Sequence, residues 1–241
     1  MVGRIATVRP VHLGEWPELG DRGCQVVWTR PVMPPEHLLD DAVQARMATL
    51  RRAEDRWSHA TGAVLADALA RAHGGPDARV VRRRGKAPVV QGDAGLYISV
   101  AHGGSWVAVA VTAMAPVGID VEPFDRELDP PTLAEQVLAP SERALVAAAT
   151  DPHHALLSYW TRKEAVVKAT GDGLRVEPRT ILVSGPGERP ALLAYPDRVV
   201  PAGGCTLVDA APDDEHVGAI AVLTSEPVTV MSLYVEHPGR G

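Results

Sequence analysis

The segment "LYISVAHGGSWVAVAVTAMAPVGIDVEP" (Leu96–Pro123) is the densest run of strand-forming residues in the chain. Its apolar residues alternate with small or polar ones, which is typical of β-strands that are half-buried. The breaks at Gly103–Gly104 and Ala115–Pro116 interrupt this alternation and predict turns between successive strands. We therefore expect a β-sheet to be built from the middle of the chain.

Helical patterns lie on both sides of this β region. The stretch 35–73 is mostly helical and ends at Gly74 and Gly75, which supply a C-terminal stop. Two further helices are expected at 131–149 and 154–170, and the second is again closed by glycine. The expected strands outside the central segment are 23–31, 180–184, 191–195, 205–210, 217–223 and 228–235.

Two segments of the chain echo one another. "DALARAHGGPDARV" (67–80) and "AVVKATGDGLRV" (165–176) both give a helix, a pair of glycines and a short Arg-Val strand. A chance similarity is the alternative, because few residues are identical. The echo predicts an α+β fold made of two similar halves with pseudo-two-fold symmetry, 1–115 and 116–241, with the active site in the cleft between them.

Composition excludes several classes of protein. Of the 241 residues, 46% are hydrophobic and 22% are charged, as in ordinary globular proteins. The net charge of −6 argues against a nucleic-acid binder, which needs a basic face. Cys24 and Cys205 are far apart and predict buried thiols in a reducing compartment. With neither a signal peptide nor an apolar run of membrane-spanning length, the sequence predicts a cytoplasmic protein that has no membrane partner.

Two carboxylates alternate in "GIDVEP" (Gly118–Pro123). In a strand, Asp120 and Glu122 lie on the same face as Gly118, about 7 Å apart at Cα. The ordinary explanation is the polar face of a half-exposed strand. The alternative is a strand end that opens onto a ligand.

A third carboxylate stands in "WTRKEAVVKATGDG" (Trp160–Gly173). On a helix, Trp160, Glu164 and Lys168 recur every four residues and share a face with Leu156. A solvated Glu–Lys pair fits this spacing but belongs on the side away from the apolar stripe. If Glu164 joins Asp120 and Glu122, the all-oxygen set favours Mg²⁺ or Mn²⁺ and a phosphorylated small molecule as substrate.

Positive charge is concentrated in "RRRGK" (Arg82–Lys86) within an otherwise acidic chain. An exposed edge strand or a phosphate clamp would each explain it. His102 stands at the diglycine turn, where backbone amides can approach an anion, although a turn histidine is often only structural. Lysine itself is rare: of 24 Lys and Arg, only Lys86, Lys163 and Lys168 are lysine.

These motifs resemble the 4′-phosphopantetheinyl transferases of the monomeric, broad-specificity (Sfp-like) type. The resemblance rests on "GIDVE" (Gly118–Glu122) and "WTRKEAVVK" (Trp160–Lys168), with weaker support from "GKAP" (Gly85–Pro88) and "ISVAHGGSW" (Ile98–Trp106). It implies two α+β halves with coenzyme A bound between them. It also implies a monomeric holo-[acyl-carrier-protein] synthase type of enzyme that moves the phosphopantetheine arm of coenzyme A to a serine of an apo carrier protein (fatty-acid, polyketide or non-ribosomal-peptide), releasing adenosine 3′,5′-bisphosphate.

The resemblance also implies roles for individual residues. Asp120, Glu122 and Glu164 would hold Mg²⁺ at the pyrophosphate, and Glu164 would accept the proton of the serine hydroxyl. Lys168 would contact a phosphate oxygen at the reacting end. The residues expected to bind the coenzyme are Arg46, Lys86, His102, Lys163 and Lys168. A coenzyme A-binding regulatory module and a Mg²⁺-dependent phosphohydrolase remain the alternatives.

Overall fold

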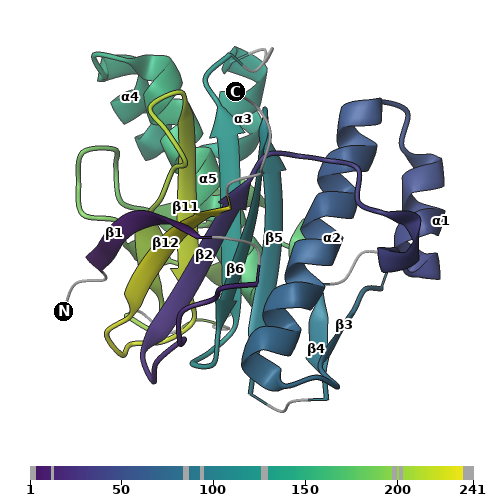
Figure 1. The fold of residues 1–241 in the computed structure, drawn as a ribbon. Coiled ribbons are helices and arrows are strands. Elements are labelled where there is room, and N and C mark those ends of the chain that lie inside the picture. Colours follow the sequence, from purple (N-terminus) through teal and green to yellow (C-terminus); the bar gives the residue numbers. More distant parts are fainter. Residues whose placement is uncertain are drawn as a thin grey trace. The chain divides into compact units, whose positions relative to one another are not determined.

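The computed structural model describes residues 4–11, 14–83, 87–92, 95–125, 130–196, 200 and 203–235 (Figure 1). It confirms a mixed α+β fold. The chain divides into two compact units, one formed by Ile5–Met114 with Thr229–Gly241 and the other by Met1–Arg4 with Ala115–Val228. Each unit is described below by itself.

The unit that begins at Ile5 is built on a five-stranded sheet with the order β1-β12-β2-β6-β5. β6 pairs antiparallel with both β2 and β5, whereas β12 runs parallel to β2. The strands are β1 (Arg4–Val11), β2 (Gly23–Thr29), β5 (Tyr97–Gly103), β6 (Trp106–Thr112) and β12 (Thr229–Val235). The central segment predicted to be β-structure thus supplies two neighbouring strands of this sheet.

Helix α2 (Ala53–Gly74) packs on strands β5 and β6 of this unit (Figure 1). Leu65 and Leu69 on its inner face join Ile98 and Val109 of the sheet in one apolar core. The shorter helix α1 (Asp41–Thr49) lies beside α2 and is capped by the side chain of Asp40. The remaining elements are η1 (Glu36–Leu38) and the paired strands β3 (Arg79–Val81) and β4 (Val89–Gln91).

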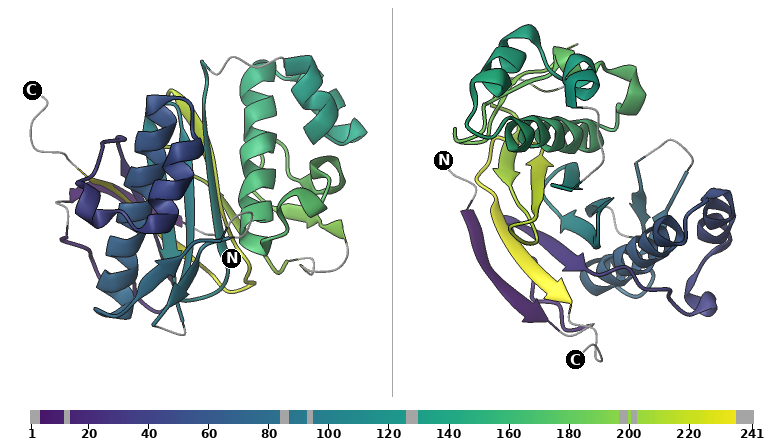
Figure 2. Two further views of the ribbon diagram at one scale, coloured as in Figure 1. Left: turned by 90° about the vertical axis from the view of Figure 1, so that its right-hand side faces the viewer. Right: turned by 90° about the horizontal axis from the view of Figure 1, so that it is seen from above.

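The unit that begins at Ala115 is built on a three-stranded antiparallel sheet with the order β10-β11-β7. Its long helix α5 (Pro152–Thr170) packs on β7 and β11, and Figure 2 shows this green helix from two further sides. The strands of the sheet are β7 (Val117–Pro123), β10 (Thr206–Asp209) and β11 (His216–Val222). The remaining elements are α3 (Pro130–Val137), α4 (Pro140–Ala148), η2 (Gly173–Arg175), η3 (Pro178–Thr180), β8 (Leu182–Val183) and β9 (Leu192–Ala194). Both units therefore place one long helix on an antiparallel pair of strands.

Gly118 allows α5 to lie unusually close to β7. A Cβ atom at this position would lie 1.9 Å from the carbonyl oxygen of Ala165 and 2.6 Å from the amide nitrogen of Ala169. The first residue of the "GIDVE" motif is therefore a packing requirement, because only a glycine lets the helix backbone touch the strand. The close contact brings the side chains that follow on β7 within reach of α5.

Two expectations about the elements need correction. The helix expected at 131–149 is two helices, because Pro140 has no N–H for a continuing helix and instead begins α4. The boundary expected near residue 116 matches the start of a unit at Ala115, but β12 pairs with β2, so the C-terminal strand groups with residues 5–114. The expectation that the active site lies between the halves stays a prediction.

Candidate functional site: three carboxylates and a lysine between β7 and α5

Helix α5 is buried on every side except one. From Ala155 to Ala169 its residues are buried, apart from Trp160, Glu164 and Lys168, which are half-buried. These three recur every four residues and so form a single stripe along the helix. Between Ala155 and Ala169, the stripe predicted from the sequence is therefore the part of this helix that a ligand could reach.

Strand β7 presents its two carboxylates to this stripe. Trp160 Nε1 donates a hydrogen bond to Oε1 of Glu122 (3.0 Å), and Lys168 Nζ donates to Oδ1 of Asp120 (2.8 Å). Lys168 also donates to the carbonyl oxygen of Ile119 (2.9 Å). The sequence-predicted residues of the strand and of the helix are thus brought together, although they are some forty positions apart.

Glu164 lies between these contacts in an environment that disfavours its charge. Burial raises the pKa of the Glu164 carboxyl, the negative charges of Asp120 and Glu122 raise it further, and Lys168 opposes them. Three carboxylates share one ammonium group here. Such an arrangement calls for a further cation or for a proton, and either would serve catalysis.

The donor set fits a hard divalent cation in its chemistry. All the candidate ligands are carboxylate oxygens, and within the part of the chain that the structure describes the buried Oδ2 of Asp120 has no hydrogen-bond partner. Among the described residues, however, no three His, Cys, Asp or Glu side chains are already arranged as a metal site. Lys168 holds one oxygen of Asp120, and Trp160 holds one oxygen of Glu122.

The structure buries Lys163 inside its unit, which disfavours the expected contact with the coenzyme. Its side chain is fully buried, and Nζ donates to the carbonyl oxygens of Val137 (2.8 Å) and Pro178 (3.1 Å) and to Oε2 of Glu142 (2.5 Å). Burial lowers the pKa of Lys163, and the neighbouring Glu142 carboxylate counteracts this. An ammonium has three N–H donors, and all three are used inside the protein.

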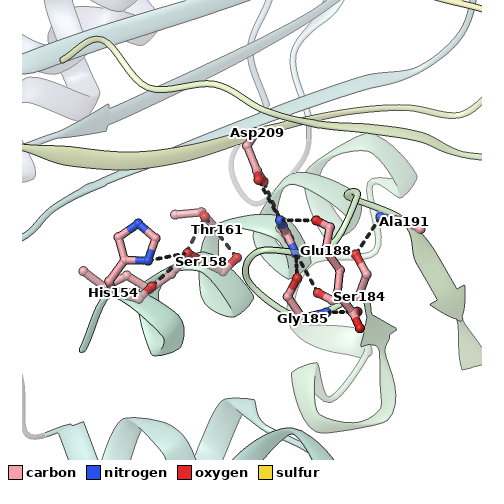
Figure 3. A network of polar contacts seen from close by, with 10 residues as sticks. His154, Ser158, Thr161, Ser184, Gly185, Glu188, Ala191 and Asp209 are labelled. Carbon is pink, nitrogen blue, oxygen red and sulfur yellow. Dashed lines mark hydrogen bonds and ion pairs between the residues drawn. The ribbon is translucent and has the colours of Figure 1, made fainter. Parts of the chain in front are cut away.

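The preceding residue, Arg162, also uses its hydrogen-bond donors inside the protein. Arg162 is 1% exposed, and its guanidinium forms a two-pronged contact with the carboxylate of Asp209 (2.7 and 2.6 Å). It also donates to the carbonyl oxygens of Ser184 (2.7 Å) and Gly185 (2.8 Å). Figure 3 shows Asp209 on one side of this network and the loop of Ser184, Gly185 and Glu188 on the other. These contacts fix α5 in its unit and leave only the stripe for chemistry.

A separate pocket of about 260 Å³ in the other unit is lined by cationic groups. Arg46 comes from α1, His59 from α2 and His102 from the end of β5, and Arg82 and Arg83 follow β3. Arg82 is paired with Asp67 (3.1 Å) and Asp40 (3.5 Å), so its charge is largely compensated. The predicted Arg46 and His102 are thus in one pocket, whereas Lys86 and Arg84 lie outside the described residues.

Several functional partners were missed from the sequence. Glu142 and Asp209 hold the two residues before Glu164, but nothing local marks them, because they are reached only through the fold. His59 lies four residues after Asp55 on α2, in a pattern that resembles an ordinary surface of a helix. The scarcity of lysine was the one available signal for Lys163. Among the helices of the described ranges, none is both long and apolar enough to cross a bilayer.

Comparisons with known proteins agree with this geometry. Residues 116–215 match the family model described as the 4′-phosphopantetheinyl transferase superfamily. The chain is 30% identical over 132 residues to the 4′-phosphopantetheinyl transferase HetI of Nostoc sp.. The match covers 54% of this chain and 53% of HetI, so the chain spans about half the length of this curated relative.

A solved structure is similar to part of the chain. The holo-[acyl-carrier-protein] synthase (AcpS) of Thermotoga maritima is 24% identical, with a TM-score of 0.40 over 46% of this chain and 64% of that one. The family match includes the strand that carries Asp120 and Glu122 and the helix that carries Glu164 and Lys168. The resemblance seen in the sequence is confirmed at the level of the superfamily, and the Sfp-like type stays a prediction.

Proposed function

We propose that this chain is a member of the 4′-phosphopantetheinyl transferase superfamily and that it transfers the phosphopantetheine arm of coenzyme A to a serine of an apo carrier protein. The observation that carries the proposal is the half-buried stripe of α5, with Glu164 and Lys168 facing Asp120 and Glu122 of β7. A fatty-acid, polyketide or non-ribosomal-peptide carrier would be the acceptor.

The reaction exchanges one phosphorus–oxygen bond for another. The serine Oγ bonds to the phosphorus next to the pantetheine arm, and the bond from that phosphorus to the bridging oxygen breaks. The serine proton passes to a carboxylate oxygen of Glu164. Adenosine 3′,5′-bisphosphate leaves with the bridging oxygen.

Lys168 is suited to the departing phosphate. Two of its three N–H groups are used by Ile119 and Asp120 in the described structure, and the third remains for a phosphate oxygen. Because the side chain is 29% exposed, its ammonium can meet a ligand without leaving the stripe. A compact positive charge in this position neutralises the negative charge that develops on the bridging oxygen as its bond to phosphorus breaks.

Asp120, Glu122 and Glu164 would together hold the divalent metal. When bound, Mg²⁺ would supply charge neutralisation at the pyrophosphate. The buried, unpartnered Oδ2 of Asp120 supports this assignment from the protein side. In the other unit, the pocket with Arg46, Arg83 and His102 would bind the 3′-phosphate of coenzyme A.

The test is incubation of the purified chain with coenzyme A, MgCl₂ and a panel of apo carrier proteins, followed by intact-protein mass spectrometry. A mass gain of one phosphopantetheine on a carrier is the expected result, and Glu164→Gln should reduce its rate by at least about 100-fold. Glu54→Gln, an exposed glutamate at the start of α2, is the matched control.

Two other outcomes would replace the proposal. Release of adenosine 3′,5′-bisphosphate without modification of any carrier would indicate a phosphohydrolase, in which water takes the place of serine. Binding of coenzyme A with no turnover on any carrier in the panel would indicate a regulatory module.

A further inference from the structure

His59 lines the cationic pocket, and one of its two ring nitrogens has no hydrogen-bond partner among the described residues. The pocket is lined by this residue together with Arg46, Arg82, Arg83 and His102, and it has a volume of about 260 Å³. Nε2 of His59 is buried, and within the described part of the chain it has no hydrogen-bond partner. A buried ring nitrogen that bonds to nothing is uncommon and calls for a partner that binds from outside.

The charged groups that face His59 come from several elements. Arg46 of α1, Arg82 after β3 and His102 of β5 act against its positive charge, and only Asp40 at the start of α1 favours that charge. Burial contributes most to the lowering of the pKa of His59, followed by these cations. The imidazole is therefore neutral at pH 7 while the pocket is empty of anions.

A phosphate dianion would reverse this balance. It would place negative charge beside the imidazole and would offset the positive charges of Arg46 and Arg82. The pKa of His59 would then rise, and the ring would take a proton from the solvent when the anion binds. The protonated ring could give the phosphate a charge-assisted hydrogen bond.

We propose that His59 is a ligand for the phosphate monoester that this pocket binds, and that it takes up a proton from the solvent as the anion enters. The inference rests on the proposed function only in taking the 3′-phosphate of coenzyme A as that monoester. It gives the pocket a second imidazole beside His102 and couples coenzyme binding to pH. Affinity falls as the pH rises, by at most about tenfold per pH unit for one proton.

The experiment is titration calorimetry with adenosine 3′,5′-bisphosphate from pH 7 to 8.5. At each pH, the heat of binding is measured in two buffers that differ in their heat of protonation. The difference between the two heats gives the number of protons taken up. Both phosphate groups of the ligand have a second pKa of about 6, below this range, and comparison of each variant with the wild type at the same pH separates their contribution from that of the protein. The full chain is used throughout.

His59→Gln is the test variant, because a glutamine amide can still donate a hydrogen bond but does not titrate. We expect it to abolish most of the proton uptake, to flatten the pH dependence and to weaken binding at pH 7 by about tenfold. His73→Gln is the matched control, because His73 is also on α2 and its pKa is also lowered by burial, but its Nε2 is bonded to Gln25 (3.0 Å). Proton uptake should be unchanged in this control.

The outcomes separate this inference from the proposed function. Two results would overturn the role of His59 and leave the transferase proposal standing. One is that His59→Gln binds the bisphosphate with unchanged proton uptake, and the other is that proton uptake is lost in His102→Gln but not in His59→Gln. If the wild-type chain fails to bind the bisphosphate at all, the pocket assignment and this inference both fall. Should His59→Gln not fold, His59→Asn and NMR titration of the wild-type histidine Cε1–H signals, with and without ligand, give the same decision.

Discussion

Two lysines five positions apart on the same helix have opposite tasks. Lys163 points inward and uses all three donors on protein oxygens, whereas Lys168 uses two of them and lies in the half-buried stripe. The helical period separates the two side chains by more than a full turn. A compact ammonium suits both positions. At Lys163 it fits a closed set of protein oxygens, and at Lys168 it would meet a single phosphate oxygen.

Lys168→Arg should lose most of the transfer activity while the protein stays folded. The planar guanidinium is larger than the ammonium and does not fit between Ile119 and Asp120 while also facing a phosphate oxygen. We expect the rate of carrier modification to fall by at least about 100-fold, as for other displaced charge-stabilising groups. Arg52→Lys, an exchange between the same two residues at an exposed site before α2, should leave the rate unchanged. Full activity in Lys168→Arg would contradict the role of a small charge at this position.

Lys163→Met should destabilise the protein without a direct effect on coenzyme binding. Removal of the ammonium leaves the buried carboxylate of Glu142 uncompensated, which typically costs about 3–5 kcal/mol. In urea denaturation, the double variant Lys163→Met/Glu142→Gln should recover part of this loss. Arg179→Met removes an exposed cation near by and should have a much smaller effect. Weakened coenzyme A binding in a folded, equally stable Lys163 variant would restore the phosphate contact expected from the sequence.

At the scale of elements, the site depends on how closely α5 approaches β7. Gly118 removes the Cβ that would strike the helix backbone, and the buried cages of Arg162 and Lys163 anchor the same helix from its other sides. In the other unit, Gly62 of α2 has a comparable position against β5 and β6, but an added Cβ there meets side-chain carbons, the nearest at 2.7 Å. Backbone atoms move less readily than side chains, so the two glycines differ in what they tolerate.

Gly118→Ala should therefore cost more stability than Gly62→Ala. The clash with the Ala165 carbonyl forces α5 away from β7, and we expect a loss of about 3 kcal/mol or more. Gly62→Ala should be milder, because Val100 can move and alanine gains about 1 kcal/mol of helix propensity over glycine. Denaturant midpoints of the two variants test the order. Equal losses would show that the helix–strand contact is more tolerant than its geometry implies.

For the whole molecule, the burial of the Glu164 carboxylate carries a cost in stability that a bound cation would reduce. Ionised Glu164 is disfavoured by burial and by its neighbours, which raises its pKa above the ordinary 4.5. An acid whose pKa is raised on folding destabilises the native state progressively as the pH rises from the unfolded value through the folded one. This is the opposite of the usual carboxylate that is stabilised by an ion pair, and it is typical of functional sites.

Glu164→Gln should accordingly stabilise the metal-free protein near pH 7. In EDTA, its denaturation midpoint should exceed that of the wild type, and the difference should shrink as the pH is lowered toward 4.5. Added MgCl₂ should raise the denaturation midpoint of the wild type but not that of the variant. At a Mg²⁺ concentration of a hundred times the dissociation constant, the free energy of unfolding of the wild type should increase by about 2.7 kcal/mol. Glu54→Gln should follow the wild type under all conditions. If MgCl₂ raises the midpoint of Glu164→Gln as much as that of the wild type, Glu164 is not a ligand of the metal.

Patterns that involve neighbours along the chain were predictable from the sequence. The alternation in Leu96–Pro123 gave the strands β5, β6 and β7, and the four-residue period gave the stripe of Trp160, Glu164 and Lys168. The split of the predicted helix 131–149 was also available in principle, because Pro140 is visible in the sequence. The return of β12 to the sheet of β2 was not, because a parallel pairing between distant strands leaves no local trace.

The amino-acid sequence alone determined which residues are candidates for the chemistry and on which face of its own strand or helix each one stands, because side-chain direction repeats with the period of the element. Only the tertiary structure decided what lies opposite each face. It enclosed Lys163 with Glu142 and Pro178, set Lys168 against Asp120, and placed His59 among arginines. These partners come from segments far apart in the chain, so burial, charge and pKa at each position are set by packing that no local pattern records.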